Sequence, residues 1–376
     1  MITIKRLVRP FAFLPFVIAL SACGGTCSRA KQTLAEEPNA QPSGVAPVGT
    51  PPPAPQISPP GWLKTDGNKL LYADGTPFHG RGANLQDTRG CNACTWEDPN
   101  PGEVIRRVDT LVDEWHANFI RLDLESYEKS EARQHYKNIL EDEGYLKDLQ
   151  KIVAHIGSKK GVYVMLSLWH DPFHSPMGWP TKDTAREWEK LAATFKDVPQ
   201  VMFGLINEPE RNEAGLLDDK VWKAMNDMAA AIRKVEGDGP HHIIAVQGTR
   251  QFARVLDYYV THPITAGGGV NIVYETHVYD PETLFQTRFV DPKKKIPVII
   301  GEFGPVTDVA QMSMSDCKKL MEVAEANDVP YLAYTFHFRC PPNLLKDTSE
   351  HGCGIGMTLQ PTEWGQLLKD RLAKPW

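Results

Sequence analysis

Short apolar runs alternate with longer amphipathic stretches along most of the chain. Apolar residues at three- and four-residue steps predict helices over residues 103–115, 145–160, 185–196, 220–236 and 314–328. The segment 250–263 is short and loop-like. Eight other runs are apolar over nearly their whole length, which is typical of buried strands: residues 78–85, 118–124, 162–169, 201–207, 242–248, 272–279, 297–303 and 331–338.

This order of elements predicts an α/β fold with a parallel sheet that is buried on both faces. Eight strand and helix units favour a (β/α)8 TIM barrel over an open doubly wound sheet. An open sheet of that kind normally carries a Gly-rich, phosphate-binding turn after its first strand. The sequence "GRGANL" in the first predicted strand does not have that pattern.

The first 22 residues have the features of an export signal. Basic residues precede the apolar stretch "FAFLPFVIAL", which is too short for a permanent membrane span. The following "LSAC" resembles a bacterial lipobox, which implies lipidation of Cys23 and attachment to a membrane. The residue after Cys23 is Gly24, whereas an Asp there would favour retention in the inner membrane. We therefore expect the protein at the outer membrane, on its periplasmic or cell-surface face. The alternative is an ordinary cleaved signal with an incidental Cys.

Residues 23–60 are rich in Pro and Ala and hold hardly any large apolar side chains. Such a segment cannot bury enough surface to offset its ordering entropy, so we expect a disordered, semi-stiff tether. The catalytic domain is predicted over residues 61–376. A net charge of −6 without a long basic run gives no reason to expect nucleic acid as a partner.

Polar residues stand where the predicted strands end. In a (β/α)8 barrel these positions meet at one mouth, which is where such folds place their active sites. Any single residue here could be structural, because strand-end carboxylates often cap the next helix. The residues concerned are Arg121, Asp123, Asn207, Glu208, His277, Tyr279 and Glu302.

Two Glu residues occupy equivalent positions on the fourth and seventh strands. Glu208 and Glu302 can therefore converge across the mouth. Carboxylates about 5 to 5.5 Å apart are what retaining glycoside hydrolysis needs, one as nucleophile and the other first as acid and then as base. Since two charges that close repel each other, we expect one of the two pKa values to be raised.

The segments "LINEPE" and "IIGEFG" resemble the signatures of glycoside hydrolase family 5, also called cellulase family A, within the clan of retaining TIM-barrel glycosidases. The resemblance covers residues 61–376. It implies that Glu208 is the acid/base and Glu302 the nucleophile. It further implies substrate-binding or supporting roles for Arg121 and Tyr279 beside the nucleophile, Asn207 at the sugar 2-hydroxyl, and His277 on the acid/base side.

Two positions depart from the family pattern. The family usually has a His after strand three, where this chain has Trp169 followed by His170. His170 is a candidate site residue, or it merely bonds a loop carbonyl. Strand eight usually ends in a Trp that stacks under the sugar, and none occurs in "YLAYTFHF". We expect Phe336 to supply this platform, with barrel core as the alternative.

Long loops after strands one and three carry Trp96 and Trp179. Each could stack on a neighbouring sugar, or could simply anchor its loop. Trp179 is a candidate for substrate binding.

Cysteines flank the predicted barrel mouth. Cys91 and Cys94 fall in the loop after strand one, and Cys340 and Cys353 follow strand eight. A four-Cys zinc site is thinkable. In an exported protein disulfides are favoured, pairing Cys91 with Cys94 and Cys340 with Cys353. Cys317 is best interpreted as a small buried residue.

These observations predict a lipid-anchored, exported and monomeric β-glycoside hydrolase that uses no cofactor and no metal. Its carbohydrate substrate is expected to be cellulose or mixed-linkage glucan, cleaved as by an endo-β-1,4-glucanase. Mannan, xyloglucan and a host or lipid-linked glycan are alternatives. A glycan-binding surface lipoprotein without activity is a rival, although such a protein has no need of a carboxylate pair. A metal-dependent hydrolase would require a His/Asp ligand cluster, which the strand ends lack.

Overall fold

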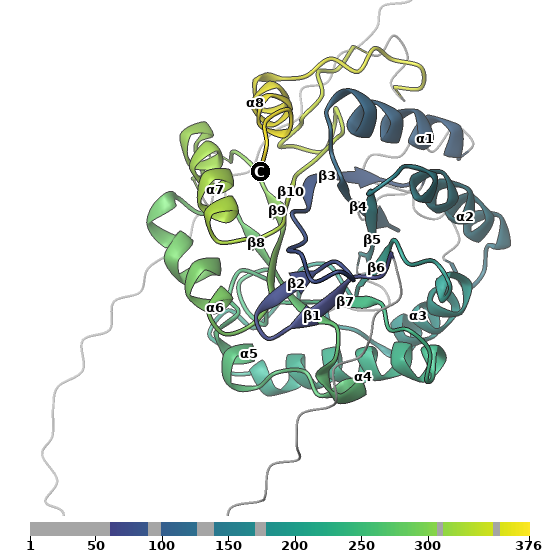
Figure 1. The fold of residues 1–376 in the computed structure, drawn as a ribbon, viewed down its shortest axis with the longest axis vertical. Coiled ribbons are helices and arrows are strands. Elements are labelled where there is room, and N and C mark those ends of the chain that lie inside the picture. The colour runs from purple at the N-terminus through teal and green to yellow at the C-terminus, as the bar shows by residue number, and fades with distance from the viewer. Residues whose placement is uncertain (1–60, 89–98, 126–138, 170–177, 307–310, 349–353) are drawn as a thin grey trace, which may run out of the picture. The chain divides into compact units, whose positions relative to one another are not determined.

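Eight parallel strands close into a barrel, as the sequence predicts. The computed structural model describes residues 61–88, 99–125, 139–169, 178–306, 311–348 and 354–376. Neighbouring strands follow the order β10-β3-β4-β5-β6-β7-β8-β9, and every pair between them is parallel (Figure 1). Their bounds are β3 Arg81–Gln86, β4 Phe119–Leu124, β5 Tyr163–Leu168, β6 Val201–Gly204, β7 Ile243–Gln247, β8 Ile272–Val278, β9 Val298–Phe303 and β10 Tyr331–Ala333. The TIM-barrel prediction is confirmed.

Helices surround the strands on the outside (Figure 1). All five predicted helices are present, and the first of them continues from α1 into a π-helical segment over Thr110–Glu114. The loop-like segment after β7 holds only the short α5, and α8 near the C-terminus was not predicted. The helix bounds are α1 Pro101–Asp109, α2 Glu143–Ser158, α3 Lys182–Phe195, α4 Asp218–Glu236, α5 Asp257–Thr261, α6 Asp291–Lys293, α7 Met314–Ala326 and α8 Glu363–Leu372.

Side-chain caps define where several helices begin. Thr181 and Thr184 form a capping box at the start of α3, and Ser313 and Asp316 form another at the start of α7. At the other end of α4, Gly237 has a φ of +63°, a left-handed conformation that glycine adopts at little cost. These local signals agree with the amphipathic pattern, so each helix packs its apolar face on the barrel.

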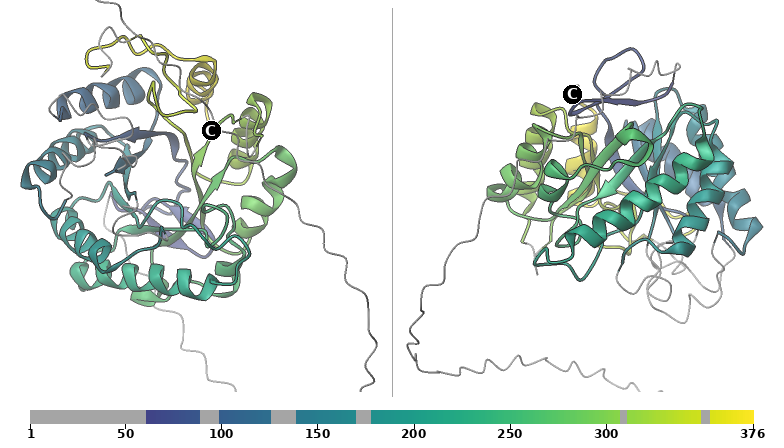
Figure 2. Two further views of the ribbon diagram at one scale, coloured as in Figure 1. Left: turned by 180° about the vertical axis from the view of Figure 1, so that it is seen from behind. Right: turned by 90° about the horizontal axis from the view of Figure 1, so that it is seen from below.

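A small hairpin closes the N-terminal end of the barrel. Strands β1 (Lys64–Asp66) and β2 (Lys69–Leu71) pair antiparallel, and the side view in Figure 2 shows them at one end of the barrel. Together with the first residues of the barrel strands, the hairpin buries a separate apolar cluster that includes Leu63, Leu70, Phe78, Phe119, Tyr163 and Met165. The opposite, C-terminal end of the strands therefore carries the polar residues.

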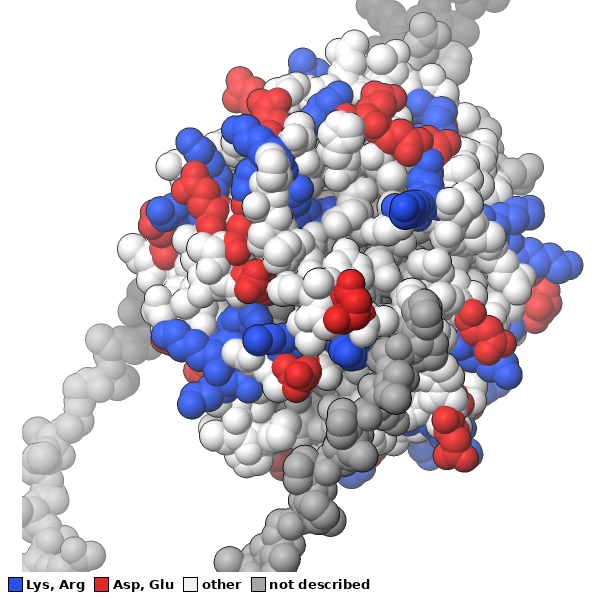
Figure 3. Space-filling model, in the orientation of Figure 1, with Lys and Arg blue, Asp and Glu red and all other residues white. Residues whose placement is uncertain are grey.

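The surface carries both signs of charge. On the face seen in Figure 3, Lys and Arg side chains are interspersed with Asp and Glu. Among the described residues, no helix is long and apolar enough to cross a membrane. The predicted export signal, the tether and Cys23 lie outside the described residues.

Candidate active site

Two carboxylates converge at the C-terminal mouth of the barrel. Glu302 belongs to β9 and is buried, whereas Glu208 follows β6 and keeps 25% of its side chain exposed. A carboxylate oxygen of Glu208 lies within 4.8 Å of one of Glu302. The backbone at Glu208 is left-handed, with a φ of +46°, and its N–H donates to the side-chain oxygen of Gln247 on β7. This bond holds the strained residue at the mouth.

Both oxygens of Glu302 accept hydrogen bonds. Arg121 donates from Nη1 to Oε1 at 2.7 Å, and the Tyr279 hydroxyl donates to Oε2 at 2.8 Å. Burial, together with the charge of Glu208, raises the pKa of Glu302 above its ordinary value, and the positive charges of His277 and Arg121 oppose this shift. The two donors favour the ionised form, which is the form that can act as a nucleophile.

Arg121 connects the strands that carry the site. This fully buried side chain donates to Asn84 and Asn207, in each case at 2.7 Å, and to Asp123 at 2.9 Å. Its Nε also lies 3.1 Å from a carboxylate oxygen of Glu275. Burial alone would lower the pKa of Arg121, but the surrounding carboxylates raise it, so the guanidinium stays charged.

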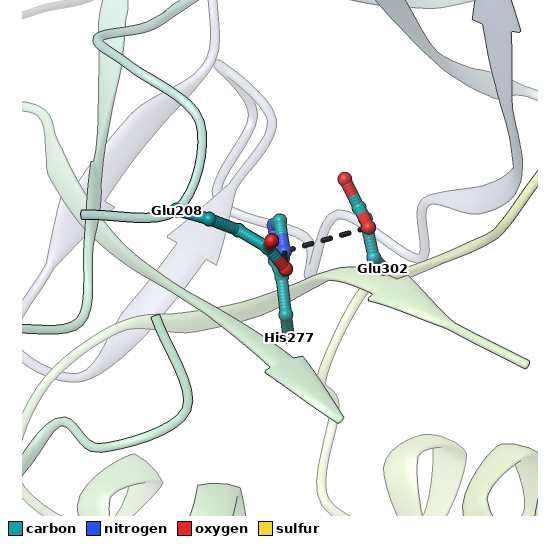
Figure 4. A group of neighbouring side chains, drawn as sticks. All are labelled: Glu208, His277 and Glu302. Atoms are coloured by element: carbon teal, nitrogen blue, oxygen red, sulfur yellow. Dashed lines mark hydrogen bonds and ion pairs between the residues drawn. The ribbon is translucent and has the colours of Figure 1, made fainter. Parts of the chain in front are cut away.

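His277 lies beside both carboxylates, and Figure 4 shows the three side chains pointing toward one another. Its Nδ1 is 2.8 Å from Oε1 of Glu208 and 3.5 Å from Oε2 of Glu302, while Nε2 is 3.1 Å from Glu275. Burial disfavours the charged imidazole, yet the three carboxylates together raise the pKa of His277 to about 9. His277 is therefore an imidazolium at neutral pH.

The same three residues have the spacing of a metal site. Among the described residues, Glu208, His277 and Glu302 form the group that could hold an ion. Both ring nitrogens of His277 are already engaged: Nδ1 faces Glu208 and Glu302, and Nε2 lies 3.1 Å from both Glu275 and the amide nitrogen of Gln247.

A cavity of about 270 Å³ opens above the carboxylates. Trp169 and Tyr334 form an aromatic wall on one side, with ring centroids 6.5 Å apart and planes inclined by 21°. The cavity is lined by Trp169, Glu208, Phe252, Arg254, Tyr279, Glu302, Val306, Tyr334, Pro341 and Pro342.

The prediction that Phe336 forms the sugar platform is wrong. Phe336 is fully buried and packs edge-on against Trp115, with centroids 4.9 Å apart. Strand β10 ends at Ala333, so the alternation assumed for a longer strand does not apply. Tyr334, the first residue after that strand, lines the cavity instead.

Trp179 anchors a loop. Its indole donates to the carbonyl of Glu210 at 2.8 Å, its ring packs on the main core, and it is not among the residues that line the cavity. These contacts agree with the loop-anchor alternative, and a sugar-binding role for Trp179 stays a prediction. His170 and Trp96 lie outside the described residues, so His170 stays a prediction.

The contacts predicted for Arg121, Tyr279 and His277 within the protein are present. Arg121 and Tyr279 bind Glu302, and His277 binds Glu208. We did not predict Asn84, Gln247 and Glu275 as members of the network. A signal for Glu275 exists in "YETHVY", because residues 275, 277 and 279 alternate onto one face of a strand.

Of the four cysteines expected in disulfides, the described residues include one. Cys340 is buried and disulfide-bonded. Cys91, Cys94 and Cys353 lie outside the described residues, so both pairings stay predictions. Cys317 is a buried free thiol, as predicted, and burial raises its pKa.

A carboxylate pair at the C-terminal mouth of a closed parallel barrel defines a glycosidase of the (β/α)8 class. The cellulase family, glycosyl hydrolase family 5, matches residues 71–339. The chain belongs to this family and is a glycosidase that hydrolyses O-glycosyl compounds.

Solved structures share the fold at low sequence identity. The cellulase Cel5C_n has a TM-score of 0.65 at 19% sequence identity, and the match covers 87% of this chain and 96% of the Cel5C_n chain. The catalytic domain of Thermobifida fusca endoglucanase Cel5A has a TM-score of 0.63 at 17%, covering 83% and 97%. A Saccharophagus degradans β-glucanase in complex with cellotetraose has a TM-score of 0.61 at 20%, covering 83% and 92%. No curated protein matches the chain.

Proposed function

We propose that this protein is a retaining endo-β-1,4-glucanase in which Glu302 is the nucleophile and Glu208 the acid/base. The observation that carries the proposal is the carboxylate geometry. Oxygens of the two groups lie within 4.8 Å of each other, which suits double displacement and leaves little room for the water that an inverting enzyme places between them.

The two carboxylates differ in a way that matches these roles. Glu302 is buried and accepts hydrogen bonds from Arg121 and Tyr279, which favour its ionised form and fix its orientation. In the first step this oxygen attacks the anomeric carbon, and the bond to the leaving oxygen breaks as Glu208 gives that oxygen a proton. Glu208 then removes a proton from water, which attacks the same carbon and releases Glu302.

The neighbouring residues support this cycle. Asn207, oriented by Arg121, is the proposed partner of the sugar 2-hydroxyl. His277 keeps Glu208 beside Glu302 through its Nδ1. Its positive charge offsets part of the repulsion between the carboxylates, so both can stay close before substrate binds.

The proposed substrate is a β-1,4-linked or mixed-linkage glucan, with mannan and xyloglucan as alternatives. Structural neighbours named as an endoglucanase and a β-glucanase support glucan, and one of these carries cellotetraose. The aromatic wall of Trp169 and Tyr334 offers flat apolar surface to sugar rings.

The test is hydrolysis by the full chain of a panel that contains β-glucans, mannan, xyloglucan and xylan. We expect new reducing ends and a rapid fall in viscosity with β-glucan, and NMR should show the β-anomer as the first product. The Glu302→Gln variant is the control for contaminating activity. An α-anomer would refute the retaining mechanism, and binding without any cleavage would favour a non-catalytic glycan-binding protein.

We also propose that the protein is an exported lipoprotein, anchored through Cys23 at the outer membrane and acting as a monomer. The "LSAC" motif and the Pro-rich segment 23–60 support this location. Growth with radiolabelled palmitate should label the wild type but not Cys23→Ser. Equal labelling of both would refute the anchor.

A further inference from the structure

The turn between β7 and α5 has an unusual backbone. Three consecutive residues, Gln251, Phe252 and Ala253, have φ values of +53°, +55° and +64°. None is glycine, so each occupies a left-handed conformation that costs on the order of 1 kcal/mol. Such strain persists only where the surroundings enforce it, and it is concentrated at functional sites.

A buried polar network holds the base of this turn. Asp218, the first residue of α4, accepts a hydrogen bond from the Thr249 hydroxyl at 2.8 Å and from Arg250 Nε at 2.8 Å. Asn212 donates to the Thr249 carbonyl, also at 2.8 Å. Strand β7 has already ended at Gln247, so the barrel itself does not require the strained residues.

The turn presents two side chains to the active-site cavity. Phe252 is 43% exposed and lines the cavity, as does Arg254. The Arg254 guanidinium carbon lies 5.8 Å from the ring centroid of Tyr279, which bonds Glu302. An aromatic ring and a cation thus face the space beside the carboxylates.

One donor of Arg254 is buried and unused. Within the described part of the chain its Nε has no hydrogen-bond partner, and its Nη1 lies 3.7 Å from a carboxylate oxygen of Asp280. Asp280 is already engaged by Arg288, which donates to both of its oxygens at 3.0 Å. Because a guanidinium binds a carboxylate through two parallel hydrogen bonds, an anionic group is its best complement.

The order of strands around the barrel indicates on which side of the scissile bond the turn between β7 and α5 lies. Around the barrel, β7 follows β6, which leads into Glu208, whereas β10 with Tyr334 adjoins β9, which carries Glu302. Glu208 protonates the leaving group in the proposed mechanism. The turn therefore stands on the leaving-group side, and Tyr334 on the opposite side.

We propose that residues 249–255 form the leaving-group site, in which Phe252 stacks on the sugar and Arg254 selects a sugar that carries a carboxylate. The preferred substrate would then be a β-glycan with uronic acid units at this position. The inference rests on the proposed function, since it needs Glu208 as acid/base and a glycosyl-enzyme at Glu302.

The same site would receive the acceptor when the glycosyl-enzyme transfers its sugar. In that step an acceptor hydroxyl attacks the anomeric carbon, the bond to Glu302 breaks, and Glu208 takes the hydroxyl proton. Water competes for the same intermediate. The ratio of transfer to hydrolysis therefore measures binding at this site independently of how much of the enzyme is active.

The experiment uses the full chain, an aryl β-cellobioside donor, and a matched pair of acceptors, methyl β-glucoside and methyl β-glucuronide. Nitrophenol release reports formation of the glycosyl-enzyme, and chromatography gives the transfer-to-hydrolysis ratio. The variants are Arg254→Gln, Arg254→Lys, Phe252→Ala and Phe252→Gly. Matched controls outside the cavity are Arg186→Gln and Leu284→Ala, and circular dichroism checks that each variant is folded.

We expect the wild type to prefer the glucuronide over the glucoside roughly tenfold, with a smaller preference at high salt. Arg254→Gln should abolish this preference and Arg254→Lys should keep part of it. Both Phe252 variants should lower transfer to either acceptor about threefold or more. The control variants should match the wild type.

An absent preference in the wild type would overturn the proposal, as would an equal loss for both acceptors in Arg254→Gln, or an unchanged ratio in both Phe252 variants. If the wild type releases no nitrophenol and forms no glycosyl-enzyme, the proposed function fails, and this inference with it. Normal release with unchanged ratios overturns the inference alone.

Discussion

The same strands carry apolar side chains at one end of the barrel and charged side chains at the other. In β4, Phe119 packs in the apolar cluster at the N-terminal end, and Arg121 and Asp123 lie in the charged network only two and four residues further on. The N-terminal end is closed by a hairpin and filled with apolar side chains. The C-terminal end buries charges that are costly unless each has a partner. Stability and chemistry are therefore separated along the strand direction, and the comparison can be tested.

The largest expected effect concerns activity at the charged end. Glu302→Gln should lower kcat on aryl glycosides by at least about 10⁴-fold, because the amide cannot form the glycosyl-enzyme. The variant should still unfold in one cooperative transition, as measured by circular dichroism. Near wild-type turnover would show that Glu302 is not the nucleophile.

Glu208→Gln should distinguish the two carboxylates. Cleavage of polysaccharide should fall about 10²- to 10⁴-fold, because the leaving oxygen needs a proton. An aryl glycoside with a good leaving group should still give a rapid burst of phenol followed by slow turnover. Stopped-flow absorbance measures both phases, and equal losses on both substrates would rule out the acid/base role.

The apolar end should show the reverse pattern. Phe78 is buried and makes edge-on contacts with Tyr72, Phe119 and Tyr163, at centroid distances of 5.2 to 5.4 Å. Phe78→Ala should lower the free energy of unfolding by about 3 to 5 kcal/mol. Urea titration measures the loss, while kcat at 25 °C should stay within about twofold of the wild type. A large fall in kcat in the folded variant would mean that the two ends are coupled.

A pH series sharpens the contrast between the ends. The pKa of His277 is about 9 in the folded protein, above its ordinary value of 6.5. The resulting stabilisation is present below pH 6.5 and is lost as pH rises through 9, in total about 3 kcal/mol. Urea titrations between pH 6 and 10 should show this loss in the wild type and a much weaker one in His277→Gln. The control His79→Gln, at the opposite end, should follow the wild type.

The smallest effect concerns the strained turn. Phe252→Gly relieves one left-handed residue and should raise the free energy of unfolding by about 1 kcal/mol relative to Phe252→Ala, which keeps the strain. Thermal unfolding of the pair measures this difference. If the glycine variant is less stable than the alanine variant, the turn is not strained in solution.

The strands and long helices could be predicted because their apolar periodicity is strong and locally encoded. The site residues could be located because polar side chains interrupt those apolar runs at the strand ends. The prediction for Phe336 failed because it depended on where the last barrel strand ends. The run "YTFHF" continues the apolar pattern, but β10 ends at Ala333, so Phe336 enters the core and Tyr334 the cavity.

Other features carry no readable signal in the sequence. The hairpin strands β1 and β2 have three residues each, too few for a periodic pattern. Left-handed turns are normally recognised by glycine, and "QFA" contains none. The turn that presents Phe252 and Arg254 therefore resembles an ordinary loop until the fold is known.

The contacts of Arg121 have a consequence for folding. Its partners come from β3, β4, the end of β6, β8 and β9, and these are separated by up to 218 positions, from Asn84 to Glu302. No fragment that lacks one of these strands can assemble the site. Recovery of hydrolysis during refolding therefore reports closure of the whole barrel, whereas circular dichroism responds as soon as local helices form. The delay between the two signals measures how far closure of the barrel lags behind helix formation.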